Sequence, residues 1–356
     1  MMPSLEEEIK AIEEEIRKTP YNKATQHHIG KLKAKLARLR EEKESQKGGG
    51  TRLGIKKSGD ATVAIIGFPS VGKSTLLNVL TNAESKIGDY YFTTTEAIPG
   101  IMEYEGCRIQ ILDLPGILSG ASSGKGRGKE IISMARIVDL LLLMVECGEE
   151  EKINLILEEL YNAGIRINQK QPNVVVKKRD RGGINVEFSR NIEMDEEMVK
   201  AIAREYFINA DIVIREEMNE DRLIDAFSKN RVYIKAIGVA NKADVRRCSK
   251  KRIGGVDIIP ISAKTGYGID LLKKKIFEKL ELIRVYMKPE GKKVEDAPLI
   301  LKKGATIGDV CRKIHRDFVK NFRYAQIWGS SATFPGQRVG KNHVVMDGDI
   351  ITLVAR

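Results

Sequence analysis

Apolar residues at helical spacing open the chain. Four of them, at intervals of four, three and four, predict a helix from Ser4 to about Lys18: Leu5, Ile9, Ile12 and Ile16. Pro20 ends this helix, because proline disfavours helical geometry in the residue before it. The same spacing then predicts a second helix, which carries Ile29, Leu32, Leu36 and Leu39. Two such stripes joined by a short break predict an antiparallel helical hairpin over residues 1–50.

The pattern changes at Ala61 to short apolar strands that alternate with helices. We expect strands at residues 61–66, 108–112, 140–145, 237–240 and 257–261. Polar residues follow several of them, namely Asp113, Asn241 and Ser262. Open α/β sheets place ligands at this end of their strands. Right-handed crossovers then predict a doubly wound sheet.

The segment between the third and fourth of these strands is about twice the length that one helix and one strand need. Within it, residues 173–176 and 184–188 read as two strands around a glycine-containing turn at 179–183, and residues 196–206 read as a helix. We therefore expect a small α+β insert at residues 165–232.

A further module follows Pro289. The pattern predicts a strand at 298–301, a helix from Thr306 to about Lys320 and strands at 324–328 and 349–354. About 65 residues in this order resemble a β-grasp, ubiquitin-like domain.

Charge adds information on partners. The formal net charge is +12, and residues 31–57 carry ten lysines and arginines against three glutamates. This balance favours polyanionic partners such as RNA or the ribosome. The lysine-rich surface of a heat-stable protein is the alternative explanation.

The composition also bears on location. No apolar run approaches the roughly 20 residues that span a bilayer, and the glutamate-rich start has no signal-peptide pattern. We expect a cytoplasmic protein without a membrane partner. The cysteines are scattered, which predicts reduced thiols: Cys107, Cys147, Cys248 and Cys311.

The strongest motif follows the first strand of the α/β pattern. It fits G-x-x-x-x-G-K-[ST], and with the next threonine it consists of Gly67, Phe68, Pro69, Ser70, Val71, Gly72, Lys73, Ser74 and Thr75. Backbone N–H groups of such a loop can wrap a β-phosphate, and the next helix points its N-terminus at it. Lys73 can reach β- and γ-phosphate oxygens, and Ser74 can ligate Mg²⁺.

A second motif, Asp113-Leu114-Pro115-Gly116, closes a later strand. Its aspartate can hold a magnesium-bound water, and the Gly116 N–H can sense the γ-phosphate. A threonine run, Thr93-Thr94-Thr95, lies between this motif and the phosphate loop, where one threonine should ligate Mg²⁺. The residues alone favour none of the three. A glycine-rich stretch at 120–128 is typical of a mobile second switch.

Two motifs at later strand ends indicate the base. In Asn241-Lys242-Ala243-Asp244, the aspartate can accept hydrogen bonds from guanine N1 and N2, which adenine does not offer. Asn241 can tie this loop to the phosphate loop, and the Lys242 stem can lie on the base. In Ser262-Ala263-Lys264, the Ala263 N–H can donate to guanine O6. The expected ligands are therefore GTP and GDP rather than ATP.

Together the motifs GFPSVGKST, DLPG, NKAD and SAK, with a threonine-rich segment ending at Ile98-Pro99-Gly100, resemble the Obg group of GTPases. The added hairpin, insert and C-terminal module are similar to the developmentally regulated GTP-binding (DRG) family, and the basic composition favours an archaeal member.

The resemblance implies a P-loop GTPase domain at 60–164 and 233–288, with the hairpin at 1–50. It identifies the insert at 165–232 as a ribosomal-protein-like α+β domain and residues 290–356 as a TGS-like β-grasp domain. It implies action in translation through the ribosome, rRNA or tRNA, and slow GTP hydrolysis. It also implies that Thr94 is the threonine that joins Ser74 on Mg²⁺. Lys73, Thr94, Asp113 and Gly116 are then the expected catalytic residues.

One departure concerns the hydrolytic water. Ile117 follows Gly116, where Ras-like enzymes have a glutamine that orients this water. An aliphatic side chain cannot do so, which leaves the backbone, a monovalent cation or an activating protein partner. Some relatives hold potassium with a P-loop asparagine, and the equivalent position here is Ser70. Potassium is thus a hypothesis for this chain.

Two functions fit these features. The first is a molecular switch in which GTP orders Thr94 and Gly116 and docks the protein on the ribosome. The second is an RNA- or ribosome-binding scaffold in which the bound nucleotide is mainly structural. Binding that ignores the nucleotide but falls steeply with salt would indicate the scaffold.

Overall fold

The computed structural model describes residues 4–22, 25–46, 58–81, 98–113, 134–189 and 192–355. The chain forms two compact units. One contains residues 1–52 and 163–233, and the other contains residues 53–162 and 234–356.

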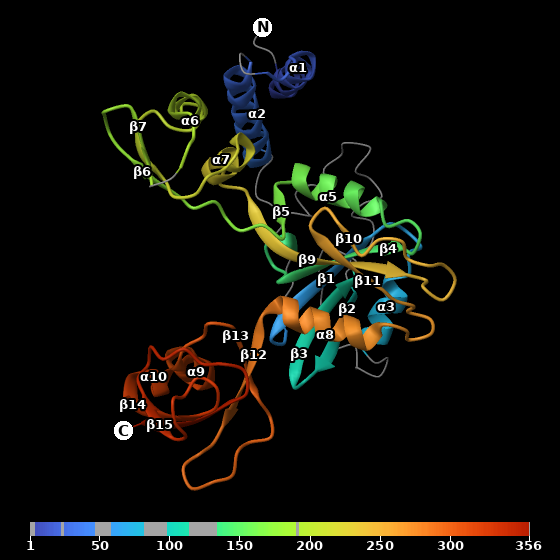
Figure 1. The fold of residues 1–356 in the computed structure, drawn as a ribbon, viewed down its shortest axis with the longest axis vertical. Helices are drawn as coiled ribbons and strands as arrows, with labels where there is room; N and C mark the ends of the chain where they lie inside the picture. Colours follow the sequence, from blue (N-terminus) through green and yellow to red (C-terminus); the bar gives the residue numbers. More distant parts are fainter. Residues whose placement is uncertain are drawn as a thin grey trace. The chain divides into compact units, whose positions relative to one another are not determined.

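The larger unit is built on an α/β sheet with strand order β10-β11-β9-β4-β1-β3-β2 (Figure 1). Five central strands are mutually parallel, and β2 and β10 are added antiparallel to them. This is the doubly wound P-loop arrangement that the sequence predicts. The strands are β1 (Ala61–Gly67), β2 (Ile98–Tyr104), β3 (Cys107–Asp113), β4 (Leu140–Glu146), β9 (Val232–Asn241), β10 (Arg252–Ile253) and β11 (Val256–Pro260).

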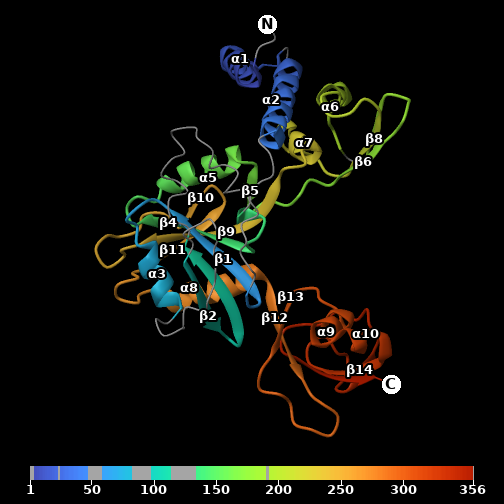
Figure 2. The ribbon, with the colours of Figure 1, turned by 180° about the vertical axis from the view of Figure 1, so that it is seen from behind.

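Helices cover both faces of this sheet. Figure 2 shows α5 (Lys152–Asn162) on one face and α3 (Lys73–Leu80) with α8 (Ile269–Leu280) on the other. Because both faces are covered, the central strands read as continuous apolar runs rather than as alternating patterns. Every residue of β1 is buried, and so are the first six of β4. The arrangement brings the ends of β1, β3, β4, β9 and β11 to one edge of the sheet.

The C-terminal part of this unit has a second sheet, with strand order β13-β12-β16-β14-β15. Its helix α9 (Ile307–Ile314) begins at a capping box formed by Thr306 and Asp309, and α10 (Arg316–Asn321) follows it. The strands are β12 (Leu282–Met287), β13 (Leu299–Lys302), β14 (Phe322–Trp328), β15 (Gln337–Val339) and β16 (Asp349–Ala355). This is the β-grasp arrangement that the sequence predicts.

The sheet starts earlier than the sequence pattern indicates. The expected boundary lies at residue 290, but β12 already belongs to this sheet, where it pairs with β13 and lies parallel to β16. The partner strand β16 is more than 60 residues away along the chain. Local periodicity carries no information on a pairing of this length.

The smaller unit combines the N-terminal hairpin with the insert. The hairpin consists of α1 (Leu5–Lys18) and α2 (Gln26–Gln46), and the insert has a three-stranded sheet in the order β6-β8-β7. Helices α6 (Glu196–Ala203) and α7 (Glu220–Phe227) complete its core together with Ala34 of α2. The other elements are β5 (Ile165–Ile167), β6 (Val174–Lys178), β7 (Ile184–Phe188) and β8 (Ala210–Ile214).

Helix α2 packs closely on α6. A Cβ atom at Gly30 would lie 2.8 Å from the Met198 sulfur, so this position favours glycine. Polar contacts reinforce the packing, since the His27 Nε2 lies 2.6 Å from an Asp195 oxygen and Lys33 donates to Asp221 at 3.0 Å. The hairpin is therefore packed against the insert within the smaller unit.

Candidate nucleotide-binding site

The turn between β1 and α3 forms a tight loop. Ser70 and Gly72 have positive φ angles of 64° and 93°. A Cβ atom at Gly67 would lie 2.4 Å from the Met144 carbonyl oxygen, and one at Gly72 would lie 2.6 Å from the Asn241 amide nitrogen. Both glycines are therefore required by close neighbours. Helix α3 begins at Lys73, so the positive end of its dipole faces the loop.

Lys73 lies across this loop. Its ammonium group donates to the Gly67 carbonyl at 3.2 Å and to the Phe68 carbonyl at 3.0 Å. Val71 is buried in the core of the sheet, whereas Pro69, Ser70 and Thr75 are exposed. The loop thus presents backbone N–H groups and one cation at the open edge, a suitable cradle for phosphate.

Ser74 and Asp113 meet beside the loop because β1 and β3 are parallel neighbours, with Ile65 opposite Asp113. The Ser74 hydroxyl donates to Asp113 Oδ2 at 2.7 Å. Asp113 is buried, and its Oδ1 atom has no hydrogen-bond partner within the described residues. A hydroxyl beside a buried, partly unpartnered carboxylate supplies the oxygen ligands that hydrated Mg²⁺ prefers.

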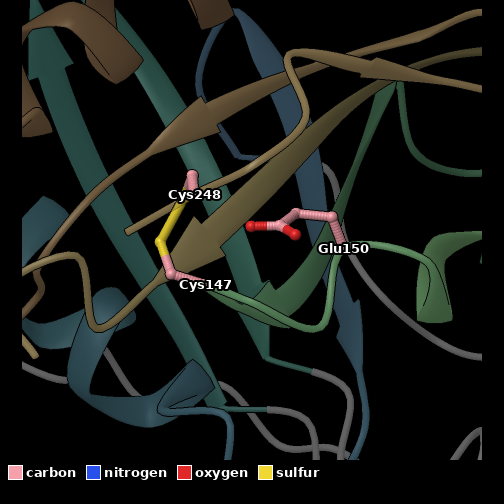
Figure 3. A group of neighbouring side chains, drawn as sticks. All are labelled: Cys147, Glu150 and Cys248. Carbon is pink, nitrogen blue, oxygen red and sulfur yellow. A yellow bond between two sulfur atoms is a disulfide. The ribbon is translucent and has the colours of Figure 1, made fainter. Parts of the chain in front are cut away.

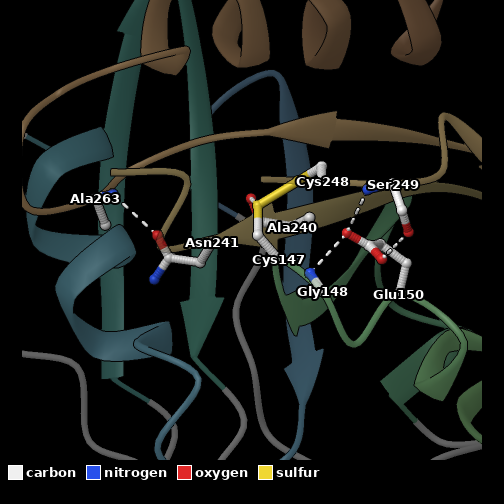
Figure 4. The surroundings of a disulfide bond; sticks show 8 residues. All are labelled: Cys147, Gly148, Glu150, Ala240, Asn241, Cys248, Ser249 and Ala263. Atoms are coloured by element: carbon white, nitrogen blue, oxygen red, sulfur yellow. Dashed lines mark hydrogen bonds between the residues drawn. A yellow bond between two sulfur atoms is a disulfide. The ribbon is translucent and has the colours of Figure 1, made fainter. Parts of the chain in front are cut away.

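Asn241 connects three segments. Its side-chain N–H₂ donates to the Val71 carbonyl at 2.9 Å, and its Oδ1 accepts from the Ala263 N–H at 3.0 Å. Figure 4 shows the second of these bonds. The residue is buried, so neither bond is replaced easily by water. One side chain therefore holds the phosphate loop against the two segments expected at the base.

Two segments are expected to bind the base, residues 241–244 and residues 262–264, and we call them the first and the second base loop. Their other residues surround this amide. Lys242 has a positive φ of 67° and pairs with Glu146 at the end of β4. The Asp244 carboxylate and Lys264 are exposed at the open edge of the sheet. Ser262 is buried, and its hydroxyl accepts from the Thr265 N–H at 3.2 Å. Its neighbour Ala263 is engaged with Asn241, whereas the sequence suggests guanine O6 as the acceptor.

A family described as "50S ribosome-binding GTPase" matches residues 62–178, the C-terminal region of that domain matches 181–282, and a TGS domain matches 283–355. An uncharacterized GTP-binding protein of Methanocaldococcus jannaschii is 54% identical over 99% of this chain and 93% of its own length. The developmentally-regulated GTP-binding protein 1 homolog of Dictyostelium discoideum is 42% identical over 99% of this chain and its whole length.

The chain belongs to the developmentally regulated GTP-binding family. It is accordingly a GTP-binding protein of the Obg type with a TGS domain, as the motifs indicate. Among solved structures, the Schizosaccharomyces pombe YchF GTPase has a TM-score of 0.47 and 16% identity over 84% of this chain and 99% of that chain.

Several residues expected at a DRG-family site lie outside the described part of the chain. They are the threonine run with Thr94, the second-switch residues Gly116 and Ile117, and the glycine-rich stretch at 120–128. The described site therefore comprises the phosphate loop, Asp113 and the two base loops.

The prediction of four reduced thiols is wrong for one pair. Cys147 and Cys248 form a disulfide, although 101 residues separate them. Cys147 directly follows β4, and Cys248 lies in the segment after β9. Because β4 and β9 are parallel neighbours, their ends meet at the same edge of the sheet. The strand order could have suggested this proximity, but cysteine spacing alone does not. Cys107 and Cys311 are free and buried, as expected.

Within the described ranges, no helix is long and apolar enough to cross a membrane.

Proposed function

We propose that this chain hydrolyses GTP slowly and acts as a nucleotide-dependent switch in translation, by associating with the ribosome or its RNA in the cytoplasm. The observation that carries the GTP part is the Asn241 side chain. It donates to the Val71 carbonyl in the phosphate loop and accepts from the Ala263 N–H in the second base loop, and both bonds are buried. Phosphate and base recognition are thereby held in one fixed spacing.

The phosphate end would work through the loop N–H groups and Lys73. On binding, the Lys73 ammonium would exchange its two backbone carbonyls for β- and γ-phosphate oxygens, which are stronger acceptors. Ser74 would hold Mg²⁺, with Thr94 as the proposed further ligand, and Asp113 would hold a water bound to the ion. The ion, when bound, offsets the negative charge of the phosphates.

The base end would work through Asp244. Its exposed carboxylate can accept from guanine N1 and N2, and the Lys242 stem would lie along the base. The Ala263 N–H would approach guanine O6, provided that it is shared with Asn241 or released by it. Loss of paired polar contacts makes discrimination against adenine large.

Ribosome or RNA association is supported by the C-terminal sheet. Tyr324 and Trp328 are half-buried and lie on the face of β14 opposite the core-facing Ala325 and Ile327. The Arg338 guanidinium lies 4.6 Å from the Tyr324 ring centre, and Lys288 lies 4.8 Å from that of Trp328. Aromatic rings flanked by cations suit stacked bases and phosphates. The matched family's printed description, which names the 50S ribosome, and the net charge of +12 point the same way.

Slow hydrolysis is proposed from Ile117, which cannot orient water. An activating partner, or potassium near the exposed Ser70, would then supply the missing function. Equal GTPase rates in potassium and sodium salts would exclude the cation.

Ribosome co-sedimentation with a GTP analogue, with GDP and without nucleotide tests the switch. Retention should be highest with the analogue. Ser74→Asn should abolish that preference, whereas Ser189→Asn, the same change at an exposed position after β7, should keep it. Lys288→Ala with Arg338→Ala should weaken retention several-fold, while Lys293→Ala in the exposed loop after β12 should not. If Ser74→Asn is still retained fully and with the same preference for the GTP analogue, the switch proposal is wrong.

The scaffold is the second candidate, and the cation–aromatic face of β14 favours it as much as it favours the switch. A scaffold predicts equal retention in all three nucleotide conditions. Its affinity would still fall steeply with salt, because phosphate contacts release counterions.

A further inference from the structure

The disulfide between Cys147 and Cys248 joins the residue after β4 to the segment after β9, with Glu150 nearby (Figure 3). Their Cα atoms are 4.6 Å apart. Cys147 is fully buried, whereas Cys248 is half-buried. Neither cysteine belongs to the motifs GFPSVGKST, DLPG, NKAD and SAK.

The first base loop continues to Cys248, and both ends of this segment, residues 241–248, are held by Cys147. At the start, the Cys147 N–H donates to the Asn241 carbonyl at 2.8 Å. At the end, the Cys147 sulfur is bonded to Cys248. Residues 241–248 thus form a closed loop whose middle carries Asp244. The Ala243 N–H also donates to the Ile261 carbonyl at 3.0 Å, so the chain directly before Asp244 is held independently of the disulfide. The disulfide therefore holds the part of the loop that follows Asp244.

A second, polar tie supports the end of the loop. The buried Glu150 carboxylate accepts from the Ser249 N–H at 3.2 Å and from the Ser249 hydroxyl at 2.9 Å (Figure 4). It also accepts from the Gly148 N–H at 2.8 Å. Burial opposes its ionisation, but these donors outweigh burial and hold the pKa of Glu150 below its usual value. The carboxylate therefore stays charged and the tie stays intact at neutral pH.

We propose that Cys147 and Cys248 are a thiol–disulfide modification site that sets the affinity and selectivity for guanine nucleotides. In the oxidised chain, the disulfide and Glu150 together hold the base loop with Asp244 in place. In the reduced chain, Glu150 alone holds its far end, and Asp244 occupies its binding position for a smaller fraction of the time. The inference rests on the proposed recognition of guanine by Asp244.

Opening the pair is thiol–disulfide exchange with a small-molecule thiol. A thiolate attacks the more accessible Cys248 sulfur, the sulfur–sulfur bond breaks, and Cys147 leaves as a thiolate that takes up a proton. A second thiolate attacks the mixed disulfide and frees Cys248. The chain gains two thiols, and two small thiols become one disulfide. Closing reverses these steps, with a small-molecule disulfide as the oxidant.

The other cysteines do not interfere. Burial raises the pKa of Cys107 to about 12 and also raises that of Cys311, so neither supplies a thiolate near neutral pH. A metal is the alternative occupant, since the ligand atoms of Cys147, Glu150 and Cys248 lie within 4.8 Å of one another. Both Glu150 oxygens already accept hydrogen bonds, however, and the sulfurs are bonded to each other.

The test measures the affinity of the full chain for GDP and IDP before and after reduction with dithiothreitol, with thiols counted by alkylation. IDP lacks the guanine 2-amino group, so it forgoes one of the two hydrogen bonds to Asp244. If the reduced loop is competent about a tenth of the time, GDP affinity should fall on the order of tenfold. IDP affinity should fall less, so that the preference for GDP shrinks.

Variants separate this inference from the function on which it rests. Cys248→Ser should bind GDP like the reduced chain and should not respond to dithiothreitol. Glu150→Gln should cost little affinity in the oxidised chain and much more in the reduced one, because the two ties support each other. If the chain prefers GDP to IDP equally strongly in both redox states, the disulfide does not set selectivity and this proposal is wrong. Guanine recognition by Asp244 would then stand.

Two other outcomes are decisive. If GDP and IDP bind equally well in both redox states, and Asp244→Asn changes neither affinity, guanine is not recognised by Asp244. The proposed role of the disulfide is then wrong as well. If the reduced chain binds Zn²⁺ tightly with loss of two titratable thiols, and zinc restores GDP affinity, the site is a metal clamp and the disulfide proposal is overturned.

Discussion

Asn241 shows how much one side chain can organise in this protein. Its amide donates to one carbonyl of the phosphate loop and accepts from the Ala263 N–H. The hydrogen-bonding capacity of asparagine, one donor group and one acceptor on a short stem, suits this position. Asn241 thus fixes the distance between the phosphate loop and the segment at Ala263, whereas the exposed Asp244 is the residue proposed to bind the base.

Asp244→Asn tests the reading of the base. The amide can accept only one hydrogen bond where the carboxylate accepts two, and its N–H₂ opposes guanine N2. We expect GTP affinity to fall about a hundredfold and xanthosine triphosphate, which has an oxygen at that position, to gain. Fluorescent-nucleotide competition measures both.

Asp257→Asn, at an exposed aspartate of β11, is the matched control and should leave both affinities unchanged. An Asp244→Asn chain that still prefers GTP would place guanine recognition elsewhere.

At the scale of elements, the start of α9 depends on one carboxylate. The Thr306 N–H and hydroxyl each donate to Asp309 Oδ2 at 2.8 Å, and Arg312 pairs with the other oxygen. The Thr306 backbone bond, followed by Arg312 and the Thr306 hydroxyl, lowers the pKa of Asp309 to about 2. This carboxylate satisfies donors that the first turn of a helix otherwise leaves unpaired.

A pH dependence follows. Because the folded pKa is depressed, the stabilisation is present above the unfolded pKa of about 4 and is lost as the pH falls towards about 2. Asp309→Asn should cost about 1 kcal/mol of unfolding free energy at pH 7 and should remove this part of the acid sensitivity. Urea unfolding at pH 7, 4 and 3 measures the difference. A carboxyl signal of Asp309 that titrates near pH 4 in NMR would contradict the cap.

At the scale of the whole molecule, the chain divides into two units with separate cores. The smaller unit contains a buried ion cluster in which Arg166 of β5 donates to Asp225 of α7 at 2.5 and 2.7 Å, and Arg231 donates to the same carboxylate at 2.6 Å. Asp225 thus lies between two guanidinium groups. The candidate nucleotide site belongs to the larger unit.

We therefore expect two unfolding transitions, one for each unit, and a different change should shift each of them. Asp225→Ala removes the buried carboxylate to which both guanidinium groups donate, and it should lower the stability of the smaller unit by about 3 kcal/mol. GDP at a hundred times its Kd should raise that of the larger unit by about 2.7 kcal/mol. Calorimetry or hydrogen exchange resolves the two. A single transition that both changes shift equally would show that the units unfold together.

The sequence by itself determined the chemistry and most of the elements. The motifs have fixed internal spacing, so Gly67 to Ser74, Asp113, Asn241 and Asp244 could be recognised without coordinates, and the family follows from them. The helices and buried strands could be predicted because their hydrophobic periods are local. The proposal of slow hydrolysis, which depends on Ile117, likewise rests on the sequence alone.

Only the tertiary structure decided which distant segments meet. The pairing of β12 with β16, the packing of α2 on α6 and the bond between Cys147 and Cys248 all join residues far apart along the chain. No local pattern encodes such pairs, because strand order and burial arise from the packing of the entire sheet. That packing brings Cys147 and Cys248 together, so that their disulfide closes the segment 241–248.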